Sequence, residues 1–185
     1  MHRMGATLGI LLAGCAAAAP AERLATTPGP SPPAATAAVN AAERAAIARV
    51  LDDFHDAAAR ADEARYFGHF AADAVFLGTD ATERWEREAF RRYAHPHFVK
   101  GKAWSFRAVR REIALDRGGA VAWFDEDLAT PNLGPARGSG VLVRGAPGAA
   151  WKIAQYNLAI TVPNERFGEV KRLLAGEAPG EAGVK

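Results

Sequence analysis

The stretch from Trp104 to Thr161, WSFRAVRREIALDRGGAVAWFDEDLATPNLGPARGSGVLVRGAPGAAWKIAQYNLAIT, decides the fold. Its many β-branched and aromatic residues predict four strands, over 104–115, 119–129, 137–145 and 149–161. Gly118-Gly119 and the run from Gly145 to Gly148 are typical of the turns that join hairpin strands. Four strands in such close succession are expected to pair in antiparallel fashion.

The segment before these strands has a helical pattern. Asn40 and Glu43 have the spacing of a capping box, so the first long helix is expected to begin at Asn40. Its apolar stripe comprises Ile47, Val50, Leu51, Phe54 and Ala58. A second helix is expected over 62–70, a strand over 74–78, and a third helix over 85–94.

Two further boundaries are predicted from proline and from capping residues. His95 precedes Pro96 and should end the third helix, because a residue before proline avoids the helical conformation. After the last strand, Asn164 is expected to cap a final helix that stops at Gly176. The apolar face of that helix would consist of Phe167, Val170, Leu173 and Leu174.

This order of elements predicts an α+β domain. Helices collected on one side of a curved antiparallel sheet would let the sheet wrap around the first helix in a cone. The open end of the cone is expected to form a pocket.

Cys15 is the only cysteine of the chain, and it closes the run Leu12-Ala13-Gly14-Cys15. Arg3 and a short apolar stretch precede it, too short to span a bilayer. The run resembles the lipobox of bacterial lipoproteins, which implies a signal peptide over 1–14 and lipid attached to Cys15. An ordinary secretory leader and a buried cysteine are the alternatives. The resemblance further implies a lipid-anchored protein of the cell envelope, at the outer membrane in a Gram-negative host.

Composition sets the limits of the remaining chain. Residues 15–39 are rich in proline and alanine and are expected to form a disordered tether, which leaves one domain over 40–176 and a flexible tail over 177–185. The net charge of +2 gives no electrostatic footprint for nucleic acid. No phosphate-binding loop, dinucleotide fingerprint or metal-ligand spacing is present, so we expect no cofactor and no metal.

Several short segments carry a family resemblance that covers about Ala42 to Leu174. They are Phe70–Phe76, Gly78–Trp85, Ala122–Glu126, Arg137–Leu142 and Trp151–Leu158. Together they resemble the nuclear transport factor 2-like (NTF2-like) superfamily, and within it a SnoaL-like bacterial subgroup. The resemblance implies the cone-shaped fold and a homodimer formed through the outer face of the sheet. It implies no particular activity, because the superfamily hosts many unrelated functions.

One activity of the superfamily is open to a test on the sequence. Ketosteroid isomerases carry a catalytic aspartate on the strand after the Phe70–Ala74-like run and a tyrosine on the first helix. The resemblance places Gly78 and Phe54 at these positions, so neither the base nor the hydroxyl is present there. Isomerase chemistry by that route is therefore not expected.

The candidate ligand-binding residues are Asp80, Trp85, His97, Trp123, Asp125, Gln155 and Asn157. Asp80 is either a base at the pocket mouth or a helix cap. His97 is a candidate acid or base, because imidazole titrates near neutral pH.

The strand candidates depend on which face of the sheet points inward. Trp123, Asp125 and Asp127 share one face of their strand, and Phe124, Glu126 and Leu128 share the other. The sequence leaves open which set faces the interior. Gln155 and Asn157 are expected on the apolar face with Ile153, either to bind a ligand or to pair with each other.

The sequence is compatible with two functions. The first is a lipid-anchored domain that binds a small apolar ligand or a protein partner without turnover. The second is a cofactor-free enzyme of the cyclase, dehydratase or isomerase type, using residues such as Asp80, His97 or Asp125.

Overall fold

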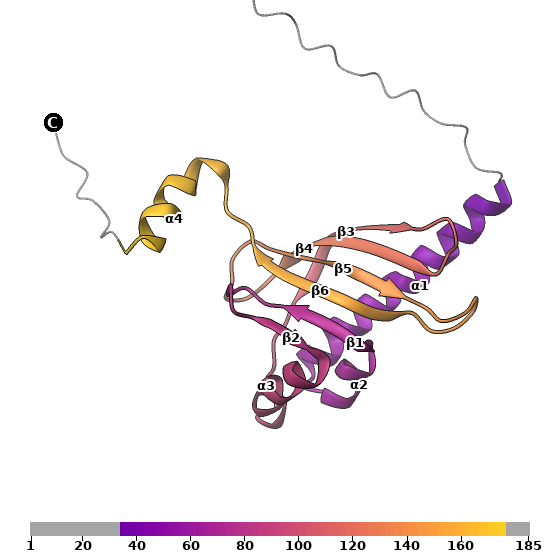
Figure 1. The fold of residues 1–185 in the computed structure, drawn as a ribbon, viewed down its shortest axis with the longest axis horizontal. Coiled ribbons are helices and arrows are strands. Elements are labelled where there is room, and N and C mark those ends of the chain that lie inside the picture. The colour runs from indigo at the N-terminus through magenta and orange to yellow at the C-terminus, as the bar shows by residue number, and fades with distance from the viewer. Residues whose placement is uncertain (1–33, 177–185) are drawn as a thin grey trace, which may run out of the picture. The chain divides into compact units, whose positions relative to one another are not determined.

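The computed structural model describes residues 34–176 and has the predicted α+β architecture. Its helices are α1 (Ala34–Ala59), α2 (Glu63–Gly68), α3 (Arg87–Val99) and α4 (Phe167–Leu174), with a short 3-10 turn η1 (Asn164–Arg166) before α4. Its strands are β1 (Phe70–Leu77), β2 (Arg84–Glu86), β3 (Arg107–Leu115), β4 (Val121–Ala129), β5 (Ala136–Val143) and β6 (Lys152–Ile160). Figure 1 shows the sheet curving in front of α1.

The six strands form one mixed sheet in the order β2-β1-β6-β5-β4-β3. The strands from β3 to β6 pair with one another in antiparallel fashion, which confirms the hairpins predicted from the glycine turns. β1 joins β6 in parallel, however, so the sheet is not wholly antiparallel. The connection from β1 to β6 contains the whole hairpin series, and such a long connection permits parallel pairing.

The core lies between α1 and the concave face of the sheet. Ile47, Leu51 and Phe54 of α1 are buried, as the helical stripe predicted. They belong to one hydrophobic core with inward-facing strand residues such as Phe124 and Leu142. Within the described residues, no helix is both long and apolar enough to cross a membrane.

The predicted start of the first helix was wrong. α1 is already helical at Ala34, so residues 34–39 do not belong to a disordered tether and Asn40 is no N-cap. Glu43 binds elsewhere: its carboxylate accepts hydrogen bonds from Arg144 Nη1 at 2.7 Å and from Trp151 Nε1 at 3.0 Å. These tertiary contacts replace the local capping box. Cys15, the predicted signal peptide and the predicted tail from 177 lie outside the described residues.

The third helix also differs from its prediction. Trp85 belongs to the short strand β2, which was not predicted, and α3 runs through Pro96 to Val99. Phe90, Ala94 and Phe98 are buried on one side of α3. The burial of Phe98 beyond the proline outweighs the hydrogen bond that Pro96 cannot donate.

Candidate functional site

A cavity of about 310 Å³ lies between the helices and the concave face of the sheet. Eight of its fifteen lining residues are phenylalanine, tyrosine or tryptophan, so its wall is mainly aromatic. Phe54 comes from α1, Tyr66 from α2, Phe90 from α3 and Tyr156 from β6. This volume is at the lower end of the range for small-molecule pockets.

Many rings of the cavity wall are nearly parallel. Phe76 and Phe90 stack with their centroids 3.9 Å apart and an angle of 11° between the ring planes. Phe76 and Tyr156 are parallel within 6° at 5.8 Å. Offset stacking of this kind is favourable for aromatic pairs, and a planar apolar ligand would meet the same surface.

Tyr66 is the polar group buried deepest in this wall. Its side chain has no exposed surface, and its ring stacks on Phe54 at 4.4 Å. Its hydroxyl has no hydrogen-bond partner among the described residues. An unpaired buried hydroxyl costs about 1–3 kcal/mol. Burial holds the pKa of the Tyr66 hydroxyl well above its ordinary value and outweighs the opposite effect of the nearby Trp104 indole, an N–H donor, so the hydroxyl stays protonated and its own proton remains free to donate.

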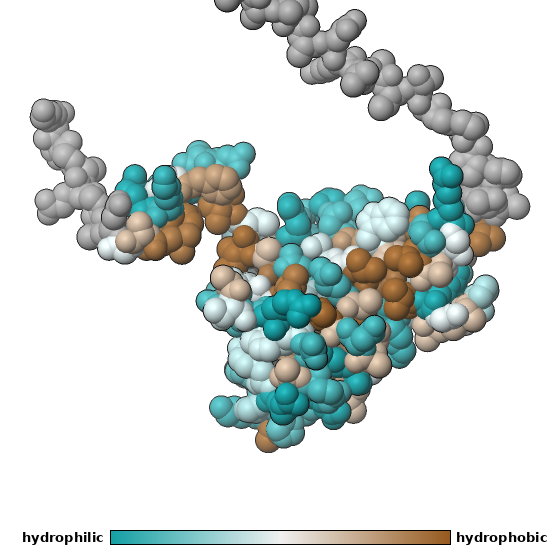
Figure 2. All heavy atoms as spheres, in the orientation of Figure 1, coloured by the Kyte–Doolittle hydropathy of each residue, from teal (hydrophilic) through white to brown (hydrophobic). Residues whose placement is uncertain are grey.

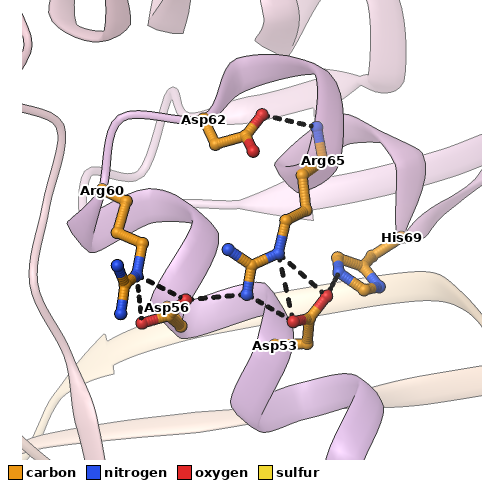
Figure 3. A network of polar contacts seen from close by, with 6 residues as sticks. All are labelled: Asp53, Asp56, Arg60, Asp62, Arg65 and His69. Atoms are coloured by element: carbon orange, nitrogen blue, oxygen red, sulfur yellow. Dashed lines mark hydrogen bonds and ion pairs between the residues drawn. The ribbon is translucent and has the colours of Figure 1, made fainter.

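A surface cluster of charged residues fixes α2, and thereby Tyr66, against α1 (Figure 3). Asp62 caps α2 by accepting a hydrogen bond from the backbone N–H of Arg65 at 3.1 Å. The Arg65 guanidinium binds Asp53 of α1, and His69 binds the same carboxylate at 2.8 Å. The hydrogen bonds from Arg65 lower the pKa of Asp53 and outweigh its partial burial. This cluster positions the site and does not reach the cavity.

A second polar network lies in the core behind the cavity, around Glu126 of β4. Glu126 is fully buried, and its Oε1 accepts hydrogen bonds from the Tyr156 hydroxyl at 3.0 Å and from His55 Nε2, in its donor form, at 2.7 Å. Its Oε2 accepts one from Arg111 Nε at 2.7 Å. Burial acts to raise the pKa of Glu126, but His55 and Arg111 outweigh it, so the pKa lies below its ordinary value.

Gly138 of β5 leaves the space that this network needs. A Cβ atom at Gly138 would lie 2.3 Å from the Tyr156 hydroxyl and 2.8 Å from Glu126 Oε1. Close approach of these side chains therefore requires glycine at this position.

Of the predicted site residues, His97 lines the cavity and Trp85 lies directly behind its wall. His97 follows Tyr93 by one turn of α3, and both belong to the lining. Trp85 stacks on Tyr93 at 4.5 Å and on Phe90 at 5.7 Å.

Asp80 is exposed and binds within its own loop. Its Oδ1 accepts hydrogen bonds from the Thr82 backbone N–H at 2.8 Å and from the Thr82 hydroxyl at 2.6 Å. These bonds from Thr82 lower the pKa of Asp80. The residue is neither part of the cavity lining nor the cap of α3, whose N-cap is Glu86.

The strand candidates Trp123 and Asp125 point away from the cavity. Glu126 takes the inward position on β4, while Trp123 is 51% exposed and Asp125 pairs with Arg110 at 2.9 Å on the outer face. The sequence left both faces possible because each carries one large aromatic residue, Trp123 or Phe124, next to acids. The choice of Trp123 and Asp125 as cavity residues was therefore wrong.

Gln155 and Asn157 were also assigned to the wrong face. Val141 pairs with Gln155 but Leu142 pairs with Ile153, so Ala154 is an extra residue that forms a bulge in β6. A bulge reverses the alternation of side chains beyond it. Tyr156 consequently points inward in their place, while Gln155 is exposed and Asn157 is half-buried opposite Ser139.

The carboxylate of Glu83 lies beside Gly78 in the cavity wall, and sequence reasoning did not predict it there. Gly78 lines the cavity, and a Cβ atom there would lie 2.0 Å from Glu83 Oε2. The Glu83 carboxylate therefore occupies the space that a side chain at position 78 would fill. A carboxylate is present at this part of the wall although residue 78 itself is glycine.

The buried residues of the Glu126 network were missed for a related reason. His55 is four residues after Leu51 and three before Ala58, so it extends the buried stripe of α1, and this spacing was its only signal in the sequence. The partner of His55 lies 71 residues away in the chain. Among the described residues, no group of three or more histidine, cysteine or acidic side chains is placed to hold a metal ion.

The fold and the cavity define a cone-shaped α+β domain with an aromatic pocket of a size that suits a small ligand. Residues 47–163 match the family model described as the SnoaL-like domain, and the chain belongs to this family. A search of curated proteins gives no match.

Solved structures with the same fold are distant in sequence. A candidate scytalone dehydratase from Novosphingobium aromaticivorans is 13% identical with a TM-score of 0.57, over 68% of this chain and 89% of that one. An NTF2-like protein of unknown function from Pseudomonas putida is 14% identical with a TM-score of 0.54, over 68% and 90%. A candidate ketosteroid isomerase from Parabacteroides distasonis is 18% identical with a TM-score of 0.50, over 63% and 86%. At these identities the likeness establishes the NTF2-like fold alone.

Proposed function

We propose that this SnoaL-like domain binds a small, largely apolar molecule in the aromatic cavity. The observation that carries this proposal is a cavity of about 310 Å³ with mostly aromatic walls and one unpaired, fully buried hydroxyl, that of Tyr66. An apolar pocket with a few convergent polar groups is the usual form of a small-molecule site. The lining includes no lysine or arginine among the described residues, which favours an uncharged ligand.

Binding is tested with a neutral fluorescent probe, N-phenyl-1-naphthylamine, whose emission rises in apolar surroundings. We expect saturable binding, and quenching or energy transfer from Trp104, which lines the cavity. Leu133→Trp would fill the mouth and should abolish binding, whereas Trp123→Phe on the outer face should leave it unchanged. The absence of saturable binding by this probe and by a panel of neutral aromatic compounds would contradict the proposal.

A second candidate function is cofactor-free proton transfer beside a carbonyl group. It is favoured by the Glu83 carboxylate in the space above Gly78. Glu83 would take the α-proton of a bound ketone, while the Tyr66 hydroxyl donates a hydrogen bond to the developing enolate oxygen. The proton then returns from Glu83 to carbon, so no oxidant or cofactor is consumed.

The position of the buried His55–Glu126 pair favours binding over this second function. The two side chains lie 2.7 Å apart, but neither belongs to the cavity lining, so this acid and imidazole are not placed to act on a bound molecule. Exchange of the α-protons of 1-indanone in D2O, followed by NMR, separates the two functions. Catalysis would give protein-dependent exchange that Glu83→Gln abolishes and that Asp80→Asn preserves. Saturable binding without any exchange would exclude the proton-transfer function and support binding.

The proposed location is the cell envelope, through lipid on Cys15. The basis is the Leu12–Cys15 sequence alone. Cys15→Ser should block processing or move the protein from the membrane fraction to the soluble fraction. A Cys15→Ser protein that is processed and fractionates as the wild type does would overturn this assignment.

The proposed assembly is a homodimer through the outer face of the sheet. Trp123 of β4 lies directly opposite Val141 of β5 on this face, and Val121 opposite Val143. Figure 2 shows hydrophobic residues gathered over β5. Sedimentation at micromolar concentration should give a dimer that Trp123→Glu converts to a monomer. A wild-type protein that remains monomeric at that concentration would exclude this assembly.

A further inference from the structure

The apolar side of α4 is exposed to solvent, whereas an amphipathic helix normally packs this side against the core. Phe167, Leu173 and Leu174 are 56%, 63% and 84% exposed, and no residue of α4 is buried. Together with Val170 they form one apolar face, which we call the α4 face. Figure 2 shows the hydrophobic side chains of this short helix open to solvent. An amphipathic helix with no cover is stable only when its apolar face finds a surface.

The topology brings α4 to the same end of the sheet as the cavity mouth. β1, β4 and β6 point in one direction, because β1 is parallel to β6 and both β4 and β6 are antiparallel to β5. The loop after β1 supplies Thr79 and Glu83 to the cavity, and the loop after β4 supplies Asn132 and Leu133. α4 follows β6 at this end (Figure 1).

The connection between β6 and α4 is short and anchored beside the mouth. Residues 161–163 link Ile160 to η1, and the Thr161 backbone N–H donates to the Pro135 carbonyl at 2.9 Å. Pro135 closes the same loop that carries Leu133. Three residues span at most about 10 Å, so the helix cannot move far from the mouth.

We propose that α4 is a lid, which closes over the cavity mouth when a ligand is bound and packs its apolar face on Leu133 and the ligand. The proposal rests on the cavity as the ligand site. A ligand would supply the apolar surface that the α4 face lacks, and the closed helix would keep water out of the cavity.

Two measurements on the same protein test the lid. The first is the dissociation rate of N-phenyl-1-naphthylamine, in the wild type and in the double variant Phe167→Glu/Leu174→Glu. We expect dissociation at least about tenfold faster in the variant, with little change in the association rate. Val39→Glu is the matched control, because Val39 is 59% exposed on α1 and should leave the rate unchanged. The second measurement is amide hydrogen exchange of α4, which should slow when the probe is added.

The outcomes separate this proposal from the function on which it rests. The probe could bind saturably while the double variant releases it at the wild-type rate and the probe does not slow amide exchange in α4. In that case the lid is wrong and the ligand site stands. If no probe binds, the ligand site itself fails and the lid fails with it. If α4 is already protected without probe, and more so at higher protein concentration, a second copy covers the helix and the lid is excluded.

Discussion

Replacing Glu126 by glutamine should strongly destabilise the domain. The substitution keeps the side-chain shape but removes the charge, and its amide nitrogen cannot accept the hydrogen bonds that one carboxylate oxygen now receives. Arg111 would lose its buried partner while its own side chain is only 10% exposed. It would keep Asp52, which is 68% exposed and therefore largely screened. Breaking a buried ion pair from one side costs about 3–5 kcal/mol.

The neighbouring residue provides a matched control. Asp125 also pairs with an arginine of β3, Arg110, at 2.9 Å, but both side chains are nearly half exposed. Asp125→Asn should therefore cost about 0–1 kcal/mol. Urea unfolding followed by circular dichroism gives both free energies, and Glu126→Gln should lower the melting temperature by about 10 °C. A Glu126→Gln protein as stable as Asp125→Asn would refute the role assigned to the buried network.

The remaining predictions concern pH, packing and the domain boundary. The pKa of Glu126 is lowered from its ordinary 4.5, so as the pH falls its carboxylate is protonated in the unfolded chain before it is protonated in the folded domain. The free energy of unfolding should therefore be highest above about pH 5 and decline as the pH falls below 4.5, which urea midpoints would measure. Gly138→Ala should destabilise by about 1–3 kcal/mol because its methyl group would overlap the Tyr156 hydroxyl, whereas Gly145→Ala meets no atom within 4 Å and should be nearly neutral in thermal unfolding. A chain beginning at Pro33 should unfold in a single cooperative transition, because the described residues 34–176 belong to one compact unit. Loss of that transition would mean that earlier residues are required.

The fold was predictable because its signals are local and repeated. Strand-forming residues between glycine turns indicated β3 to β6, and a helical stripe indicated the buried side of α1. The failures occurred where tertiary contacts outweigh local preference. Glu43 binds Arg144 and Trp151 in place of capping a helix at Asn40, and buried Phe98 carries α3 through Pro96.

The site was less predictable because it depends on single-residue changes of register. The extra residue at Ala154 turned Gln155 and Asn157 outward and Tyr156 inward, and nothing in the alternation of β6 indicates a bulge. His97 was identified from its chemistry and lies in the cavity lining. Tyr66 was missed because nothing in the sequence distinguishes it from a tyrosine of the hydrophobic core. Only the structure shows that its hydroxyl lacks a partner among the described residues.

The most direct test of the ligand site is a titration of the ¹⁵N-labelled protein with N-phenyl-1-naphthylamine, observed through the indole N–H signals of its four tryptophans. Trp104 lines the cavity, Trp85 lies behind its wall, and Trp123 is on the outer face of the sheet. We predict saturable shifts that are largest for Trp104, smaller for Trp85 and absent for Trp123. Shifts confined to Trp123, or no saturable shift at any of the four, would contradict the assignment of the cavity as the binding site.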